Sequence, residues 1–184
     1  MNPTTAISAS ASASNLQAWF HVARHTYAIV DAQTLPQIVP MLSDSGLVDW
    51  GRLHPGAAAT DGAEAWCLRL TPELPLSHWL LAGEGAGIAD WGVIACSDAS
   101  FREVRQHLRG LLEVQMPRGE RVALRWYRPP VLHTLLPLCS ASQLTRFFGP
   151  VRAFATVDGE RWRWLRQTNG KLDEQTIKQA PVSA

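Results

Sequence analysis

Cysteine is scarce in this chain of 184 residues, which contains three: Cys67, Cys96 and Cys139. Their number is odd and they lie far apart in the sequence, so we expect free thiols in a reducing compartment rather than a disulfide framework. Residues 1–14 lack the basic start and the unbroken apolar run of a secretory signal. No apolar run reaches the roughly 18 residues that span a bilayer. These absences favour a cytoplasmic protein.

Lysine is scarcer still, with Lys171 and Lys178 alone, so arginine carries nearly all of the positive charge. The net charge is +1, but it is distributed unevenly. Residues 1–99 hold three Arg against nine acidic residues, a balance of −6, and residues 100–166 hold twelve Arg against five, a balance of +7. Because Arg suits bidentate pairing and stacking at interfaces, the halves are expected to present faces of opposite sign. The alternative is that they neutralise each other across the fold.

The sequence motifs of nucleotide, metal and hydrolase sites are also missing. The Gly-rich run 83–87 lies before an expected strand instead of after one, and Ile88 occupies the place of the third glycine of a dinucleotide-binding loop. His21 and His25 are four residues apart, but the Glu of a zinc-protease motif does not lie between them. The chain contains no G-x-S-x-G. We therefore predict a non-enzymatic protein that needs neither a cofactor nor a metal.

The composition that remains is that of a folded domain. Hydrophobic residues make up 46% of the chain and charged residues 18%, and the eight Trp are enough to anchor a core. Low-complexity Ser, Ala and Thr fill residues 1–14, while residues 168–184 are polar and lack apolar periodicity. We expect one domain over residues 15–167, flanked by two flexible tails.

Strand-like and helix-like periodicity alternate along this domain. Strands are expected at 27–32, 48–53, 66–70, 91–96 and 122–127. Helices are expected at 15–23, 35–42, 76–81, 101–112, 129–138 and 144–148. A loop rich in Gly, Ala and Pro is expected at 54–63. This alternation predicts an α/β fold, a single domain with helices packed on a mixed β-sheet.

Local signals mark the ends of two of these elements. Ser100 and Glu103 have the S-x-x-E spacing of a capping box, which predicts the start of a helix. Asp158-Gly159 separates two strand-like runs, which predicts a C-terminal β-hairpin that adds antiparallel strands at a sheet edge.

Three arginines give the first group of candidate partner-binding residues. Arg102, Arg105 and Arg109 lie on the side of the 101–112 helix opposite its apolar stripe. We expect them either to form a solvated face or to contact a partner. His107 lies between the two stripes and is expected to make a structural hydrogen bond.

The junction between the expected strand 122–127 and the following helix gives a second group. Arg125 is expected to pair with an acidic residue of the first half of the chain. Tyr127 and Arg128 lie where the strand gives way to the helix, and such connections often carry function. All three are candidate partner-binding residues.

Trp162 and Trp164 complete the candidates. They alternate with Arg161 and Arg163, so the Trp and Arg side chains face opposite sides of an expected strand. The Trp side is expected either to enter the core or to face a partner. Single-stranded nucleic acid binds where aromatic and cationic side chains share one exposed face. A nucleic-acid-binding module that uses the Arg-rich half is therefore the alternative function, not the leading one.

An ordered set of segments resembles a known family. The set comprises Tyr27-Ala28-Ile29-Val30-Asp31-Ala32, Trp91-Gly92-Val93-Ile94, His107-Leu108-Arg109-Gly110-Leu111-Leu112, Arg125-Trp126-Tyr127-Arg128-Pro129 and Phe147-Phe148-Gly149-Pro150. Over roughly residues 25–166 the chain is similar to the effector chaperone (adaptor) domain of bacterial type VI secretion systems, long known only as a domain of unknown function. The set includes polar residues that packing alone does not dictate.

The resemblance implies a cytoplasmic, non-enzymatic chaperone or adaptor. Such proteins bind a cognate toxin, the effector, usually at its N-terminal region. They help to load it on the spike protein at the tip of the secretion tube. The resemblance implies these two protein partners, no nucleic acid and no membrane, and it leaves the oligomeric state open.

The sequence departs from the family pattern at two places. Arg128 occupies the position of the family's Asp before the Pro, so any role of that carboxylate is lost or reversed in charge. The segment 66–70 occupies the place of a strand that resembles Ala-Pro-Tyr-Leu in the family.

Overall fold

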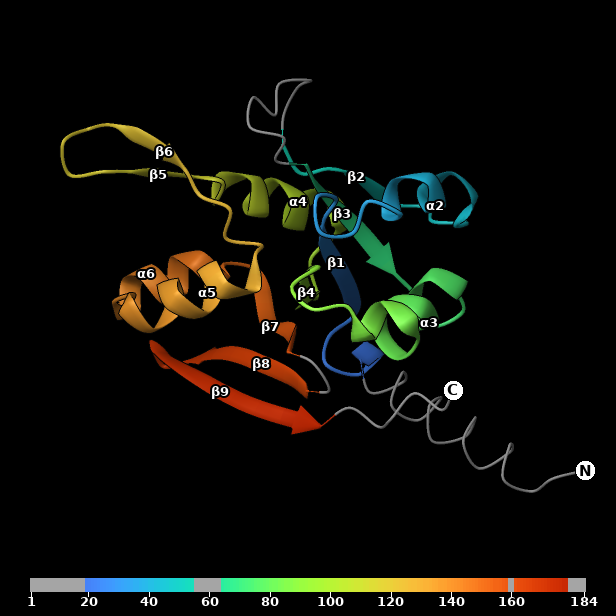
Figure 1. Cartoon of the computed structure of the whole chain (residues 1–184). Coiled ribbons are helices and arrows are strands. Elements are labelled where there is room, and N and C mark those ends of the chain that lie inside the picture. The colour runs from blue at the N-terminus through green and yellow to red at the C-terminus, as the bar shows by residue number, and fades with distance from the viewer. Residues whose placement is uncertain (1–18, 55–63, 159–160, 179–184) are drawn as a thin grey trace, which may run out of the picture.

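A seven-stranded sheet forms the centre of the computed structural model, which describes residues 19–54, 64–158 and 161–178 (Figure 1). The strands lie in the order β2-β3-β1-β4-β7-β8-β9. Their bounds are β1 His25–Asp31, β2 Trp50–Arg52, β3 Ala65–Leu70, β4 Gly92–Ser97, β7 Val151–Asp158, β8 Arg161–Thr168 and β9 Lys171–Lys178. The expected single α/β domain is confirmed. Its sheet was expected to be mixed, but each described pairing is antiparallel.

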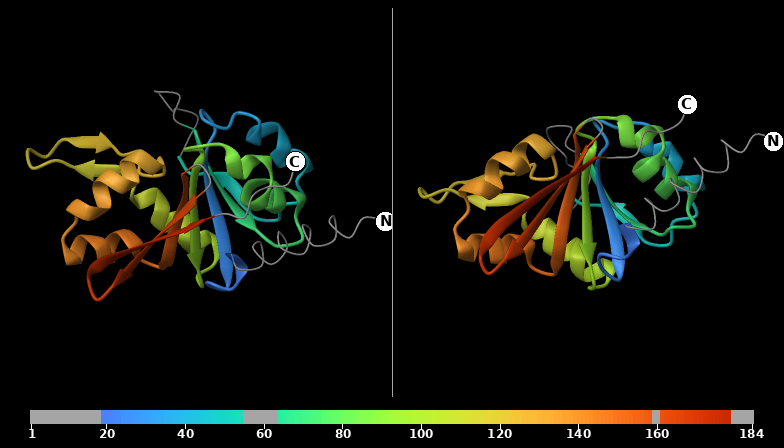
Figure 2. Two further views of the ribbon diagram at one scale, coloured as in Figure 1. Left: turned by 60° about the horizontal axis from the view of Figure 1, so that its bottom comes forward. Right: turned by 90° about the horizontal axis from the view of Figure 1, so that it is seen from below.

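Helices cover both faces of this sheet, so the domain has three layers (Figure 2). One layer comprises α2 (Ile38–Asp44), α3 (Pro75–Ala82) and the 3-10 helix η1 (Glu84–Gly87). The other comprises α4 (Phe101–Gly110), α5 (Pro129–Leu135), the 3-10 helix η2 (Leu136–Leu138) and α6 (Ala141–Phe148). None of the helices in the described part of the chain has the length and apolar character that crossing a membrane requires.

β1 contributes to two hydrophobic cores, one on each face of the sheet. Ala28 and Val30 lie in the core beneath α2 and α3, and Tyr27 and Ile29 lie in the core beneath α4, α5 and α6. All four are fully buried. A strand covered on both faces is apolar at successive positions, which is why this segment is a continuous apolar run.

The Trp-Gly pair at the start of β4 has a physical explanation. Trp91 is fully buried in the core beneath α2 and α3. Gly92 has a φ of 155°, and a Cβ atom there would overlap the carbonyl oxygen of Ile29 on β1. The close approach of the two strands therefore requires glycine.

α4 begins as its sequence predicts. The Ser100 hydroxyl accepts a hydrogen bond from the Glu103 N–H at 3.4 Å, and the Glu103 carboxylate accepts one from the Ser100 N–H at 2.9 Å. The expected structural hydrogen bond of His107 is also present, because its Nε2 lies 2.8 Å from the carbonyl oxygen of Phe147. This bond joins α4 to α6.

The expected buried strand at 122–127 is wrong. Its first residues belong to β6 (Arg121–Ala123), which pairs with β5 (Glu113–Gln115) in a separate two-stranded ribbon that projects from the domain (Figure 1). β6 is exposed, whereas the following Trp126 and Tyr127 are fully buried without forming a strand. The turn at Gly119, with a φ of 88°, reverses the chain so soon that the two flanking segments pair with each other.

The predicted C-terminal hairpin is confirmed by the pairing of β7 with β8, although its turn residue Gly159 lies outside the described residues. The expectation of a flexible tail after Thr168 needs correction at residues 171–178. There β9 pairs with β8 along its whole length and forms the edge of the sheet. Asn169 and Gly170 have φ values of 51° and 74°, as in the tight turns that favour Asn-Gly.

Smaller differences concern short elements. In the expected strand 48–53, Trp50–Arg52 is the part that forms one, and the Gly-rich run 83–87 contains η1. The expected Asn15 cap and most of the expected loop 54–63 lie outside the described residues.

Candidate interaction surfaces

A buried ion pair joins β1 to the start of α5. Asp31 ends β1 and its side chain is 1% exposed, while Arg128 lies immediately before α5 and is 37% exposed. The Arg128 Nε donates to the Asp31 Oδ2 at 2.8 Å. This hydrogen bond is the main reason why the pKa of Arg128 is raised. Arg128 is thus held by a carboxylate 97 residues away in sequence.

Gln33 extends this pair into a small polar network. Its Oε1 accepts hydrogen bonds from Arg128 Nη2 at 3.2 Å and from Arg125 Nη1 at 3.3 Å. The backbone N–H of Gln33 donates to the Asp31 Oδ1 at 3.0 Å. The structure therefore brings Arg125 and Arg128 together at one junction, where Asp31 is bound to Arg128.

Tyr127 lies beneath this junction rather than on its surface. Its side chain is fully buried and its hydroxyl lies 3.5 Å from the Nε2 of His54. Burial raises the pKa of Tyr127 to about 12. Burial, followed by the charge of Arg125, lowers the pKa of His54. Both groups are neutral near pH 7, so the charge of the junction comes from its guanidinium groups and Asp31.

The Arg stripe of α4 divides into two kinds of residue. Arg105 donates from Nε and Nη2 to the carbonyl oxygen of Arg52 at 3.1 and 2.6 Å, and Arg109 donates from Nε to that of Leu53 at 2.7 Å. These bonds hold the short edge strand β2 and the residue after it against α4. Arg102 is exposed and has no described ion pair or hydrogen bond.

Trp162 and Trp164 lie in the core. They are 4% and 7% exposed, and the ring of Trp19 lies over both, with centroid distances of 4.5 and 4.7 Å. The side chains of β8 do alternate as predicted. Neither indole offers a surface to a partner in this conformation.

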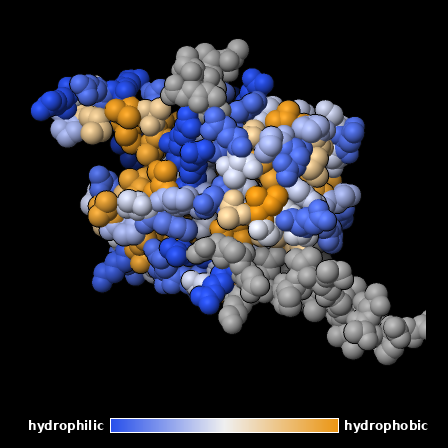
Figure 3. All heavy atoms as spheres, in the orientation of Figure 1, coloured by the Kyte–Doolittle hydropathy of each residue, from blue (hydrophilic) through white to orange (hydrophobic). Residues whose placement is uncertain are grey.

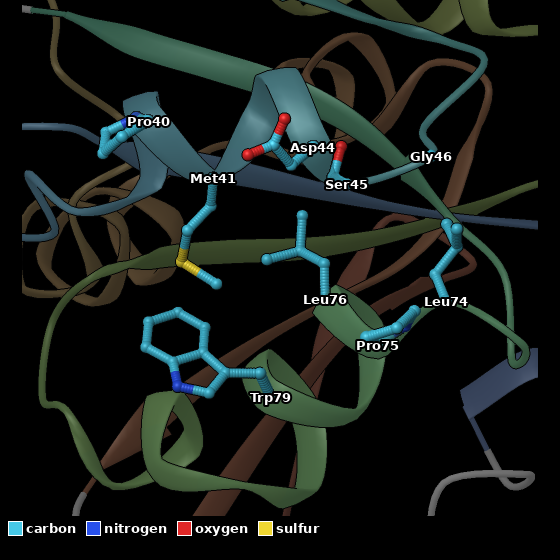
Figure 4. Close-up of a pocket in the computed structure, with 9 residues that line it drawn as sticks. All are labelled: Pro40, Met41, Asp44, Ser45, Gly46, Leu74, Pro75, Leu76 and Trp79. Carbon is cyan, nitrogen blue, oxygen red and sulfur yellow. The ribbon is translucent and has the colours of Figure 1, made fainter.

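An open apolar groove lies between α2 and α3 and was not predicted from the sequence. Its volume is about 820 Å³, and nine residues line it: Pro40, Met41, Asp44, Ser45, Gly46, Leu74, Pro75, Leu76 and Trp79. Met41 of α2 and Trp79 of α3 face each other at one end, and Leu76 lies between the helices (Figure 4). Hydrophobic surface is visible between these helices in Figure 3, separated by hydrophilic residues from a second apolar area over β6 and α5.

Few polar groups line this groove. Asp44 is exposed on its α2 side, and the hydroxyl of Ser45 is engaged with the carbonyl oxygen of Leu42 at 2.8 Å. No Lys, Arg or His is among the lining residues. Sites for small polar ligands rely on several convergent polar groups, so this groove is better suited to apolar side chains of a larger molecule.

A sequence signal for the groove does exist. Ile38 and Leu42 form the buried stripe of α2, yet Val39 and Met41 are also apolar and lie outside that stripe. A helix that is apolar on more than one side has surface left to cover. The sequence does not indicate that Leu74 and Pro75 lie beside α2, because only the folded chain brings them to the groove.

Comparison with known proteins gives one match. No curated protein and no solved structure matches the chain. The family described as a domain of unknown function, DUF4123, matches residues 26–146, from β1 into α6, and leaves β7, β8 and β9 outside the match. Because that match covers more than half of the sequence, the chain belongs to the DUF4123 family.

Proposed function

We propose that the protein is a non-enzymatic chaperone or adaptor that binds a cognate type VI secretion effector in the cytoplasm and helps to load it on the spike protein. The observation that carries the proposal is the open apolar groove between α2 and α3, with its volume of about 820 Å³. An apolar groove between two helices is a place where apolar side chains of a partner can bind. The ordered segments that resemble effector chaperones lie in the same domain.

The Arg junction supplies a second surface of different chemistry. Arg128 is 37% exposed beside its buried carboxylate. Guanidinium groups bind carboxylates of partners with defined geometry. An apolar groove and a separate cationic surface suit a protein that must contact an effector and a spike protein together.

Nucleic-acid binding receives less support from the same side chains. A stacking platform needs exposed aromatic rings beside cations, and Trp162 and Trp164 are buried. Arg105 and Arg109 are engaged by backbone carbonyl groups. No feature of the described residues favours this alternative over protein binding.

Affinity capture from the native bacterium tests the proposal. The tagged protein would be expressed at its normal level, cross-linked in cells and purified, and its bound chains identified by mass spectrometry against an untagged strain. We expect one toxin-like effector, with or without the spike protein, to be enriched. Enrichment of nucleic acid alone, or of neither protein, would overturn the proposal.

A further inference from the structure

As a group, the apolar side chains that line the groove between α2 and α3 are only partly buried in the core. Met41 and Trp79 are half-buried, because each packs against the core on one side and lines the groove on the other. Leu76 is 3% exposed and forms the buried part of the lining. The floor is therefore fixed by the core, and the walls present surface to solvent.

The apolar surface continues beyond the groove. A second hollow of about 180 Å³ shares Gly46 and Leu74 with it, and its lining adds Val48 and the polar residues Asp49, Arg69 and Thr71. The Val48 side chain is 92% exposed. An apolar track therefore runs from Trp79 past Leu74 to Val48, with polar neighbours at its Val48 end.

The charge beside this track is negative and unpaired. Asp44 lines the groove, and Glu73 is exposed next to Leu74. Within the described part of the chain, neither carboxylate has a cationic group within 4.0 Å. The nearby Arg69 is engaged by Asp49 at 2.9 Å. A ligand that supplies both apolar side chains and cations would complement this surface.

We propose that the groove binds a basic amphipathic helix of the client protein. Apolar side chains of that helix enter between Met41 and Trp79, and its Lys or Arg side chains meet Asp44 and Glu73. A groove between two helices accepts the apolar ridge of a third helix, in the mode by which amphipathic helices bind elsewhere. The inference rests on the proposed function, because the client is the effector, and it adds the chemical class of the segment that the groove recognises.

The chain itself does not supply such a helix. The segments outside the described residues, 1–18, 55–63, 159–160 and 179–184, contain no Lys or Arg. The described helices that carry Arg, α4 and α6, bury their apolar stripes in the core of the other sheet face. Neither a segment of this chain nor a second copy therefore offers the required combination of charge and apolar surface.

Binding of two designed peptides tests this chemistry. One is a fluorescein-labelled helix of Leu and Lys, and its matched control carries Glu in place of each Lys. We expect the Leu/Lys peptide to bind the full-length protein, measured by fluorescence polarisation, and the Leu/Glu peptide not to bind. Failure of the Leu/Lys peptide to bind, or equal binding of both peptides, would overturn the inference.

Variants place the binding in the groove. Asp44→Lys reverses the charge beside the apolar lining and should weaken binding of the Leu/Lys peptide roughly tenfold. Lys in the last turn of α2 is compatible with the helix dipole, so this protein should fold. Glu120→Lys makes the same change in net charge on the projecting ribbon and should leave the affinity unchanged. Equal affinities of the two variants would contradict the inference.

Met41→Lys tests the apolar wall and separates the inference from the proposed function. This variant should lose peptide binding and should fail to capture the effector in the native bacterium, while Glu120→Lys captures it normally. Folding of each variant is checked by circular dichroism and thermal unfolding. If Met41→Lys still captures the effector, the groove inference fails and the proposed function stands. If even the wild-type protein captures no effector, the proposed function fails, and the peptides alone decide the chemistry of the groove.

Discussion

At the scale of single residues, the contact between Asp31 and Arg128 satisfies a buried carboxylate. A buried carboxylate needs a charged or hydrogen-bonding partner, and Arg128 supplies one through its Nε at 2.8 Å. The sequence predicted an ion pair between Arg125 and the acidic half of the chain, which stays a prediction, and it did not predict the pair that Arg128 makes. Arg125 and Arg128 both reach Gln33, and only the folded turn decides which one faces Asp31.

Arg128→Met should lower the free energy of unfolding by about 2 kcal/mol, because it leaves Asp31 buried without its cation. The loss is below that of a fully buried pair, since Arg128 is 37% exposed. Adding Asp31→Asn should recover most of the loss, because no unpaired charge is then buried. Urea unfolding measures both, with Arg102→Met as an exposed control expected to change stability by less than about 0.5 kcal/mol. Equal stabilities of Arg128→Met and Arg102→Met would contradict the role of the pair.

The two tyrosines of the chain, Tyr27 and Tyr127, give a direct optical test of burial. Burial raises the pKa of each to about 12, whereas an unfolded Tyr ionises at about 10. The folded state therefore holds these protons more tightly than the unfolded state between those values, and stability falls as the pH rises from about 10 to 12. Tyrosinate absorbance should show no step near pH 10 in the native protein and should show one in urea. A native step near pH 10 would contradict the burial of these rings.

At the scale of secondary-structure elements, local chemistry explains what could be predicted. The capping box at Ser100 and the hairpin of β7 and β8 were indicated by residues close together in the sequence, and both are confirmed. β9 is different, because apart from the half-buried Leu172 its described side chains are exposed and mostly polar, and its pairing with β8 is a backbone property. The Asn169-Gly170 turn was the available signal for it.

The contribution of the α4 cap to the free energy of unfolding can be measured with a single substitution. Ser100→Ala removes the acceptor of the Glu103 N–H and one half of the capping box, so we expect a loss of about 1 kcal/mol in unfolding free energy. Ser43→Ala, at an exposed position inside α2, is the matched control and should cost little. Chemical denaturation of both variants decides the point, and equal midpoints would contradict the capping role.

At the scale of the whole molecule, the surfaces were harder to predict than the core. Apolar runs indicated the buried strands because burial on both sheet faces demands them. The groove joins Met41 to Leu74 and Trp79, which belong to segments that only the fold brings together. The separation of acidic and Arg-rich halves along the sequence predicted surfaces of opposite sign, and this stays a prediction. Arg128 and Arg152 pair with acidic residues of the first half, and Arg105 and Arg109 bind backbone carbonyl groups.

Export of effectors by the native bacterium tests the proposed chaperone most directly. The culture supernatants of the wild type, a strain that lacks this gene and the complemented strain would be compared by quantitative mass spectrometry. We expect one effector to disappear from the supernatant of the deletion strain and to return on complementation, while other substrates of the same secretion system are still exported. Unchanged export of every effector, or loss of all of them together, would contradict a chaperone that serves one client.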